Sequence, residues 1–279
     1  LISTTQVARA MAPETQPAQP AHRTNLFSTQ RVDMWWLQPV ALWVTLVGFV
    51  VYATWRVFEN AHFAATAGGA YHYISPFASP NLTWLFSAGL KEAVPLLAYP
   101  AFLILPIPAG FRFTCYWFRR SYYRAFVARP AACAVEAAKG VRYKGERGLL
   151  VFQNLHRFFL YLVIVKMLFD AWHVVTAVYH DQHLYLGLGV LILAIDIVLL
   201  SFYVFGCHAF RHLVGGRLDC FSCDAISMRQ YSFWKAVTKL NQRHGLWAMA
   251  SLFWVAITDL YIRHLSITGA THVLGVIPA

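Results

Sequence analysis

Six side chains that can bind a soft metal ion or carry out redox chemistry are predicted to lie at one level of this chain. Each is a cysteine or histidine within about one turn of the end of a hydrophobic segment: Cys115, His156, Cys207, His208, His212 and His244. Polar, oxidisable side chains are costly inside a bilayer, and membrane-embedded chains keep them mainly where they serve a function. The spacing therefore predicts a bound redox or metal centre close to the water interface.

The donor types narrow the chemistry but leave alternatives open. Thiolate and imidazole together suit zinc and iron–sulfur centres, and two Cys with two His could hold a Rieske-type [2Fe–2S] cluster. His208 and His212 are four residues apart and share one helical face, whereas adjacent Cys207 and His208 point about 100° apart. A haem bound by two imidazoles would leave the cysteines unused. In the structural alternative, the histidines contact lipid headgroups and the cysteines pack as small apolar side chains.

Cys220-Phe-Ser-Cys223 is a second candidate for cysteine ligation. A CxxC motif can form half of a zinc or iron–sulfur site, or a redox pair. It lies in a polar loop after Gly215 and Gly216, and no second CxxC accompanies it. Because all five cysteines are in or near segments that we assign to the reducing cytoplasmic side, structural disulfides are not expected.

The elements that must position these residues are membrane helices. The chain is 58% hydrophobic and 13% charged, with a mean hydropathy of +0.49. Five segments are each near the roughly 20 residues needed to cross the hydrocarbon core: 39–58, 94–118, 156–179, 184–206 and 244–265. The pattern predicts an all-α integral membrane protein with a five-transmembrane-helix bundle, whose core could hold a cofactor.

The positive charge predicts the orientation of the bundle. Of the Lys and Arg residues behind the net charge of +11, nine lie in residues 119–157 and six in 207–243, whereas 59–93 carries only Lys91. Since basic loops stay inside, the N-terminus and both basic segments are predicted to face the cytoplasm and the C-terminus the outside. A multi-pass protein of the plasma (cell inner) membrane, surrounded by lipids, explains this charge without a nucleic-acid partner.

The flanking segments complete the predicted organisation. Residues 1–30, rich in Ala, Pro, Thr and Gln, are predicted to be a disordered cytoplasmic tail. Residues 31–265 form the anchor and 266–279 an external C-terminal tail. Trp35 and Trp36 are expected at headgroup depth.

Several charged residues fall inside the predicted spans, where unpaired charges are costly. Lys166 and Asp170 are four apart, followed by His173, and could form either a structural polar contact or a proton path. Asp196 requires a partner from another helix. Asp259 and Arg263 are expected to form a structural pair.

Four strings in this order carry a family resemblance: Tyr73-Ile-Ser-Pro-Phe-Ala-Ser-Pro80, 111–124, Cys207-His-Ala-Phe-Arg-His-Leu-Val-Gly-Gly216 and Lys239-Leu-Asn-Gln-Arg-His244. From about residue 31 to 265 the chain resembles the membrane subunit of actinobacterial succinate dehydrogenase. In particular, it is similar to the single five-helix anchor of the mycobacterial type-F respiratory complex II.

The resemblance implies a subunit of a succinate:quinone oxidoreductase that is not catalytic alone towards succinate. A flavoprotein subunit would oxidise succinate, an iron–sulfur subunit would relay the electrons, and this anchor would pass them to menaquinone or ubiquinone. It further implies an embedded Rieske-type [2Fe–2S] cluster, with Cys115 and Cys207 on one iron and two of the four histidines on the other. Cys220 and Cys223 are not part of the family pattern.

A quinone head needs hydrogen-bond donors near the same depth. Those available are also plausible headgroup anchors: Trp36, Tyr116, Arg119, Arg157, Trp234, Lys235 and Arg243. The basic loops could equally dock an acidic partner subunit. Two alternatives stay open. One is a di-haem anchor with haem b held by His156 with His244 and by His173 with His264; the other is a metal-binding or structural membrane protein without electron transfer.

Overall fold

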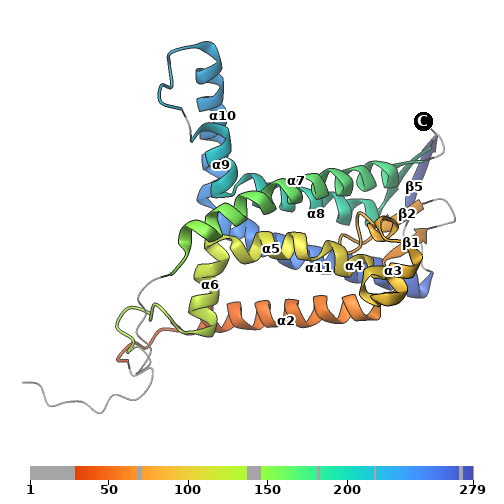
Figure 1. Cartoon of the computed structure of the whole chain (residues 1–279), viewed down its shortest axis with the longest axis horizontal. Coiled ribbons are helices and arrows are strands. Elements are labelled where there is room, and N and C mark those ends of the chain that lie inside the picture. Colours follow the sequence, from red (N-terminus) through yellow and green to blue (C-terminus); the bar gives the residue numbers. More distant parts are fainter. Residues whose placement is uncertain are drawn as a thin grey trace, which may run out of the picture.

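A computed structural model describes residues 29–67, 71–136, 146–180, 183–216, 218–269 and 273–278, and these residues are mainly helical (Figure 1). Within them, four helices are long and apolar enough to cross a membrane: α2 (Leu37–Glu59), α7 (Leu149–Val178), α8 (Leu188–Phe205) and α11 (His244–Thr268). They run lengthwise through the molecule and correspond to the first, third, fourth and fifth predicted spans. In lipid a helix satisfies its own backbone hydrogen bonds, which is why such apolar segments become helices.

The second predicted span, 94–118, is not one continuous helix. It is divided into η2 (Pro95–Ala98), α4 (Pro100–Ile104) and α5 (Pro106–Thr114), and it continues into α6 (Tyr116–Phe126). Each of the first three begins with a proline, which cannot donate to the preceding turn but fits the first helical position. Between α5 and α6 the chain bends by 79°. The described residues therefore contain four helices that could span a membrane, or five spans if this bent pair counts as one.

One end of the bundle carries strands, so the all-α prediction is incomplete. β1 (Ala64–Ala67) pairs with β2 (Tyr71–Ile74), and β3 (Tyr179–His180), β4 (His183–Gly187) and β5 (Val273–Pro278) form a second antiparallel sheet. Two short helices, η1 (Thr83–Leu85) and α3 (Ala88–Ala93), lie at the same end (Figure 1). We call it the strand end. β5 lies within the predicted C-terminal tail, which thus contributes a paired strand. Residues 1–28 of the predicted N-terminal tail lie outside the described residues.

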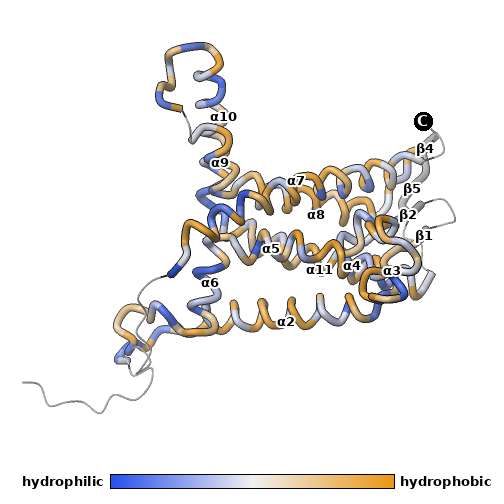
Figure 2. The backbone as a smooth tube through the Cα atoms, viewed as in Figure 1, coloured by the Kyte–Doolittle hydropathy of each residue, from blue (hydrophilic) through white to orange (hydrophobic). Residues whose placement is uncertain are grey.

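At the opposite end, helices replace the predicted basic loops. α6 leaves the bundle on one side, and α9 (His208–Gly215) with α10 (Ala225–Gln242) leaves it on the other, both roughly perpendicular to the long helices (Figure 1). We call this the cysteine end because Cys115 and Cys207 lie there. The long helices are mostly hydrophobic in colour, and hydrophilic residues concentrate at both ends and on these extensions (Figure 2).

Two buried clusters hold the helices together. The larger lies toward the cysteine end, where α5, α6, α7, α8 and α11 meet around Phe111, Phe118, Leu160, Tyr203 and Leu252, and includes both cysteines. The smaller lies at the strand end around Tyr73, Tyr185, Val190 and Ile262. Apolar side chains on the outer surface of the spans remain exposed, among them Val51, Leu168 and Phe253, as expected for a bundle whose surroundings are lipid.

Candidate metal centre at the cysteine end

Three of the six predicted ligands come together from three different breaks in the chain. Cys115 is the extended residue between α5 and α6, Cys207 follows α8 as the N-cap of α9, and His244 is the first residue of α11. Both cysteines are buried, with 3% and 0% of their surface exposed. Cys115 Sγ lies 3.4 Å from His244 Nε2, and the Cys207 thiol is near enough to Cys115 to interact with it electrostatically.

The other histidines lie at different distances from this group. His156 is buried on α7, where its ring stacks on Phe111 at 4.4 Å and its Nδ1 lies 3.1 Å from Thr114 Oγ1. His156 and His208 both interact electrostatically with His244. His212 is exposed on α9. The structure therefore places His156 and His208, but not His212, beside the group formed by Cys115, Cys207 and His244.

Burial raises the pKa of the Cys207 thiol, and the local backbone structure offsets part of this effect. Cys207 Sγ accepts a hydrogen bond from the backbone N–H of Phe210 at 3.2 Å, at the N-terminus of α9. The positive end of a helix dipole and an N–H donor both stabilise a negatively charged sulfur, which is the form that binds metals. On α9, partial burial lowers the pKa of His208, and the nearby Arg211 and His212 side chains lower it further. Its imidazole is therefore neutral at pH 7 and able to bind a metal.

Several buried polar atoms around the group have no partner. Among the described residues, His244 Nδ1 and Trp247 Nε1 have no hydrogen-bond partner, and the Tyr203 hydroxyl has none but the Cys115 thiol. The Tyr203 ring stacks on His244 at 5.1 Å. An unpaired buried polar group costs about 1–3 kcal/mol, so such a concentration is expected where a bound group supplies the missing partners.

Arg112 adds a buried cation to the same place. Its guanidinium donates to Ala248 O at 2.9 Å and to Ser251 Oγ at 3.0 Å, and it lies 4.6 Å from the centre of the Tyr203 ring. Neither Arg112 nor Tyr203 was predicted from the sequence. A signal was present, since Arg112 interrupts an apolar segment and Tyr203 lies one helical turn before Cys207.

The arrangement fits a soft metal centre in donor type and burial, but the donors contact one another. Within the described residues, no group of three or more His, Cys, Asp or Glu side chains has metal-binding geometry. Cys115 and His244 must separate for a cluster to lie between them. The start of α11 also packs closely against α6. A Cβ on Gly245 would lie 2.3 Å from Trp117 Nε1, so only glycine lets α11 begin this close to α6.

The seven predicted quinone donors are distributed over three regions. Trp36 lines a cavity of about 400 Å³ beside Arg124 of α6, whereas Trp234 and Lys235 lie on α10, with Lys235 lining a groove against α8. The remaining four lie on or near α6, α7 and the start of α11: Tyr116, Arg119, Arg157 and Arg243. They do not surround one pocket.

Arg119 is the buried member of that set, with 4% of its surface exposed. Its Nε forms an ion pair with Glu146 Oε1 at 3.2 Å. In the described part of the chain none of its three guanidinium nitrogens has a hydrogen-bond partner, because the ion pair lacks hydrogen-bond alignment. Its guanidinium lies 5.0 Å from the centre of the Phe152 ring.

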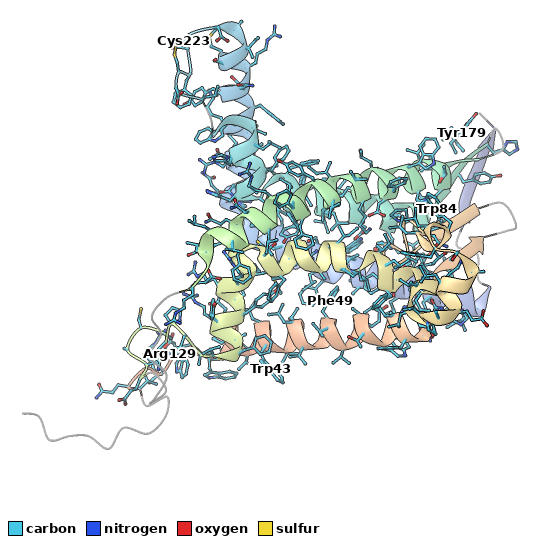
Figure 3. The ribbon with its side chains drawn as sticks, in the orientation of Figure 1. Trp43, Phe49, Trp84, Arg129, Tyr179 and Cys223 are labelled. Atoms are coloured by element: carbon cyan, nitrogen blue, oxygen red, sulfur yellow. A yellow bond between two sulfur atoms is a disulfide. The ribbon has the colours of Figure 1, made fainter. Side chains whose placement is uncertain are left out.

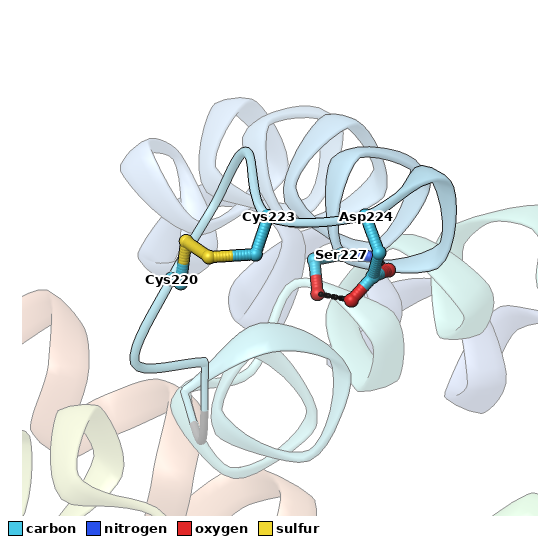
Figure 4. Close-up of a disulfide and its surroundings, with 4 residues drawn as sticks. All are labelled: Cys220, Cys223, Asp224 and Ser227. Carbon is cyan, nitrogen blue, oxygen red and sulfur yellow. Dashed lines mark hydrogen bonds between the residues drawn. A yellow bond between two sulfur atoms is a disulfide. The ribbon is translucent and has the colours of Figure 1, made fainter.

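Cys220 and Cys223 form a disulfide, which corrects the expectation that no disulfide is present (Figure 4). The loop brings their Cα atoms to 5.8 Å, within the range of a disulfide. Directly afterwards, the Asp224 carboxylate caps α10 by accepting a hydrogen bond from the Ser227 backbone N–H at 2.7 Å. The pair lies at the far tip of the α9–α10 extension, away from Cys115 and Cys207 (Figure 3).

Charged residues inside the spans are paired differently from the prediction. Lys166 Nζ and Asp170 Oδ2 do pair, at 2.6 Å. The predicted pair of Asp259 and Arg263 is wrong, because Asp259 binds Arg56 Nε at 2.7 Å while Arg263 binds Glu59 at 2.6 Å. Both partners come from α2, which the sequence spacing within α11 could not reveal.

Comparisons with known proteins identify the chain's relatives. The family model described as actinobacterial succinate dehydrogenase subunit SdhC matches residues 37–268. A chain in the solved structure "Mycobacterium smegmatis Sdh1 complex in the apo form" is 33% identical with a TM-score of 0.76, and the alignment covers 92% of this chain and 97% of that chain. The comparison with curated proteins finds no match. The chain therefore belongs to the SdhC family of actinobacterial succinate dehydrogenases and is the membrane-anchor subunit of such a complex.

Proposed function

We propose that this anchor carries electrons from an iron–sulfur subunit to quinone through an embedded Rieske-type [2Fe–2S] cluster. Its ligands are Cys115, Cys207 and His244, with His156 or His208 as the second imidazole. The observation that carries the proposal is the convergence of two buried cysteines and His244 beside polar atoms that lack partners.

The surrounding residues give this site the charge stabilisation and the dry surroundings that suit a one-electron carrier. When bound, such a cluster accepts and releases single electrons at a potential raised by its imidazole ligands. The α9 N-terminus favours the Cys207 thiolate, and the Arg112 guanidinium offsets negative charge in the same buried region. The surrounding core, including Phe111, Phe118 and Leu252, excludes water.

Arg119 is the donor that we propose for the quinone head. It is buried, its Nη1 and Nη2 have no hydrogen-bond partner among the described residues, and it lies close enough to His156 to interact electrostatically. Arg119 could therefore donate to a quinone carbonyl beside the cluster, while Tyr116 and Phe152 provide the apolar surface that quinone sites require. Menaquinone and ubiquinone both present such a carbonyl.

The cysteine end is also the side on which we place the flavoprotein and iron–sulfur subunits. The basic residues predicted to face the cytoplasm of the cell lie on α6, α9 and α10, and include Arg120, Arg124 and Lys239. Such a surface complements an acidic partner. Docking there gives electrons the shortest route to Cys115 and Cys207.

Electron paramagnetic resonance of the purified complete complex, oxidised and dithionite-reduced, tests this function. A Rieske-type signal that arises on reduction and disappears in Cys207→Ser is the expected result. Low-spin haem signals in the oxidised sample would replace the proposal with a haem b anchor, using His156 with His244 and His173 with His264. The absence of both signals would favour a zinc-binding or structural anchor.

A further inference from the structure

A line of ionisable side chains crosses the interior of the bundle. From the strand end it passes along α7 through His173, Asp170 and Lys166, reaches Asp196 on α8, and continues to Arg112 on α5. The line ends at Arg112, whose guanidinium lies 4.6 Å from the centre of the Tyr203 ring. The electron transfer proposed above does not use the first four of these residues.

Neighbouring members of the line interact with one another. Lys166 Nζ lies 2.6 Å from Asp170 Oδ2, and His173 interacts electrostatically with both. Asp196 interacts with Lys166 and Asp170 of α7 and with Arg112 of α5, which are the charged groups facing it. His173, Asp170, Lys166, Asp196 and Arg112 therefore form a continuous series of interacting ionisable groups.

Asp196 is the member that a structural role explains least. Only 3% of its surface is exposed, and Oδ1 has no hydrogen-bond partner in the described part of the chain. A buried carboxylate that serves only stability is expected to be paired and hydrogen-bonded, because leaving it unsatisfied is costly. Ionisable groups kept inside a bilayer at such a cost often belong to proton relays.

A cavity lies between Arg112 and the Lys166–Asp170 pair, and Asp196 does not line it. It has a volume of about 370 Å³ and is lined by Arg112, Lys166 and Asp170, with apolar walls that include Phe49 of α2. Phe49 lies between α2 and α5 (Figure 3). Because a water molecule occupies about 30 Å³ of liquid, the cavity has room for several, and its three charged groups offer the polar partners that such waters need. Toward the strand end, His173 is only partly buried.

We propose that this line conducts protons through the membrane from the strand end to the cysteine end. There they are consumed when quinone takes up two electrons and two protons to become quinol. The electrons come from succinate through the partner subunits, and each proton enters from water at the strand end and passes through the Asp196 carboxyl. The destination of the protons rests on the proposed function, and the transfer moves positive charge across the membrane.

The test uses the complete complex reconstituted in liposomes with quinone, under a potassium diffusion potential of either sign. Wild-type quinone reduction should accelerate when the cysteine-end side is negative. In Asp196→Asn the rate should fall about tenfold or more, as for loss of a proton-transfer group, and should no longer respond to the potential. Artificial-acceptor activity that stays with the washed liposomes should be unchanged, which shows that the partner subunits remain bound to the anchor.

Thr258→Val is the matched control, because Thr258 is buried on α11, its Oγ1 has no partner among the described residues, and it lies off the line. It should keep the wild-type response. If Asp196→Asn does not assemble, the charge-neutral pair Lys166→Gln with Asp170→Asn replaces it, with the same expected result. A potential response that survives these substitutions, or is absent from the wild type during normal quinone reduction, overturns the proton route. Failure of wild-type quinone reduction with intact artificial-acceptor activity contradicts the proposed function as well.

Discussion

Both ends of the bundle bury charged side chains, but the Arg56–Asp259 pair at the strand end is hydrogen-bonded, whereas Arg119 at the cysteine end forms an ion pair without a hydrogen bond among the described residues. At the strand end Asp259 is 0% exposed. It accepts hydrogen bonds from Tyr52 Oη at 2.5 Å, from Arg56 Nε at 2.7 Å and from Ser75 Oγ. The remaining guanidinium nitrogens of Arg56 bind Glu59 and backbone carbonyls. This network joins α2, the segment after β2, and α11.

At the cysteine end several buried polar atoms lack a hydrogen-bond partner among the residues described: His244 Nδ1, Trp247 Nε1 and the guanidinium nitrogens of Arg119. The difference separates stability from function: a completed network holds helices in place, whereas an incomplete one is expected where a cofactor or substrate supplies the remaining bonds.

The largest effect is expected from removing a proposed ligand at the cysteine end. Cys207→Ser should abolish the cluster signal and lower quinone reduction by about 100-fold or more, since even outer-shell changes cost about 10–100-fold at metal sites. Electron paramagnetic resonance and a quinone-reduction assay on the same sample measure both. Cys133→Ser is the control, because Cys133 is free and exposed. A Cys207→Ser complex with a normal signal would remove Cys207 from the ligand set.

Substitutions of the four histidines test which of them bind the proposed cluster at the cysteine end. His244→Ala should also eliminate the cluster signal, because His244 contacts Cys115. His212→Ala should retain it, because His212 is exposed on α9. Single substitutions of His156 and His208 then identify the fourth ligand, and loss of the signal in only one of them is the expected pattern. Loss in His212→Ala would instead show that α9 moves toward the cluster.

At the strand end the expected effect is on the stability of the anchor. Asp259→Asn leaves Arg56 buried without its counter-charge and should destabilise the anchor by about 3–5 kcal/mol. Thermal unfolding of the complex in detergent measures the change, and Thr258→Val, one residue away, is the control with a smaller shift. The assembled Asp259→Asn complex should keep its cluster signal. A lost signal at unchanged stability would mean that the two ends are coupled.

The smallest effect is expected at the tip of α10. Replacing Cys220 and Cys223 together by Ser removes the disulfide but touches neither end of the bundle. The cluster signal and quinone reduction should both remain at wild-type levels in the spectroscopic and kinetic assays. A reduced signal would indicate that this extension contributes to the centre or to subunit docking.

The sequence alone predicted much of this protein because membrane spans obey local rules. Apolar segments of sufficient length must become helices in lipid, which placed α2, α8 and α11 within four residues of their observed bounds, whereas α7 begins seven residues before the predicted span. The family resemblance likewise followed from short strings, and the SdhC match confirms it. The Lys166–Asp170 pair was predictable for the same reason, since both residues lie on one helix.

What only the tertiary structure decided depends on how separate segments meet. No spacing within α11 could show that Asp259 pairs with Arg56 of α2, or that Arg263 pairs with Glu59. The 79° bend at Cys115 and the loop that brings Cys220 close to Cys223 are features of the backbone path that hydropathy does not record. The placement of His156 and His208, but not His212, beside Cys115 and His244 was equally hidden. Periodicity fixes a residue's depth and helix face, whereas its partner is set by the packing of helices distant in sequence.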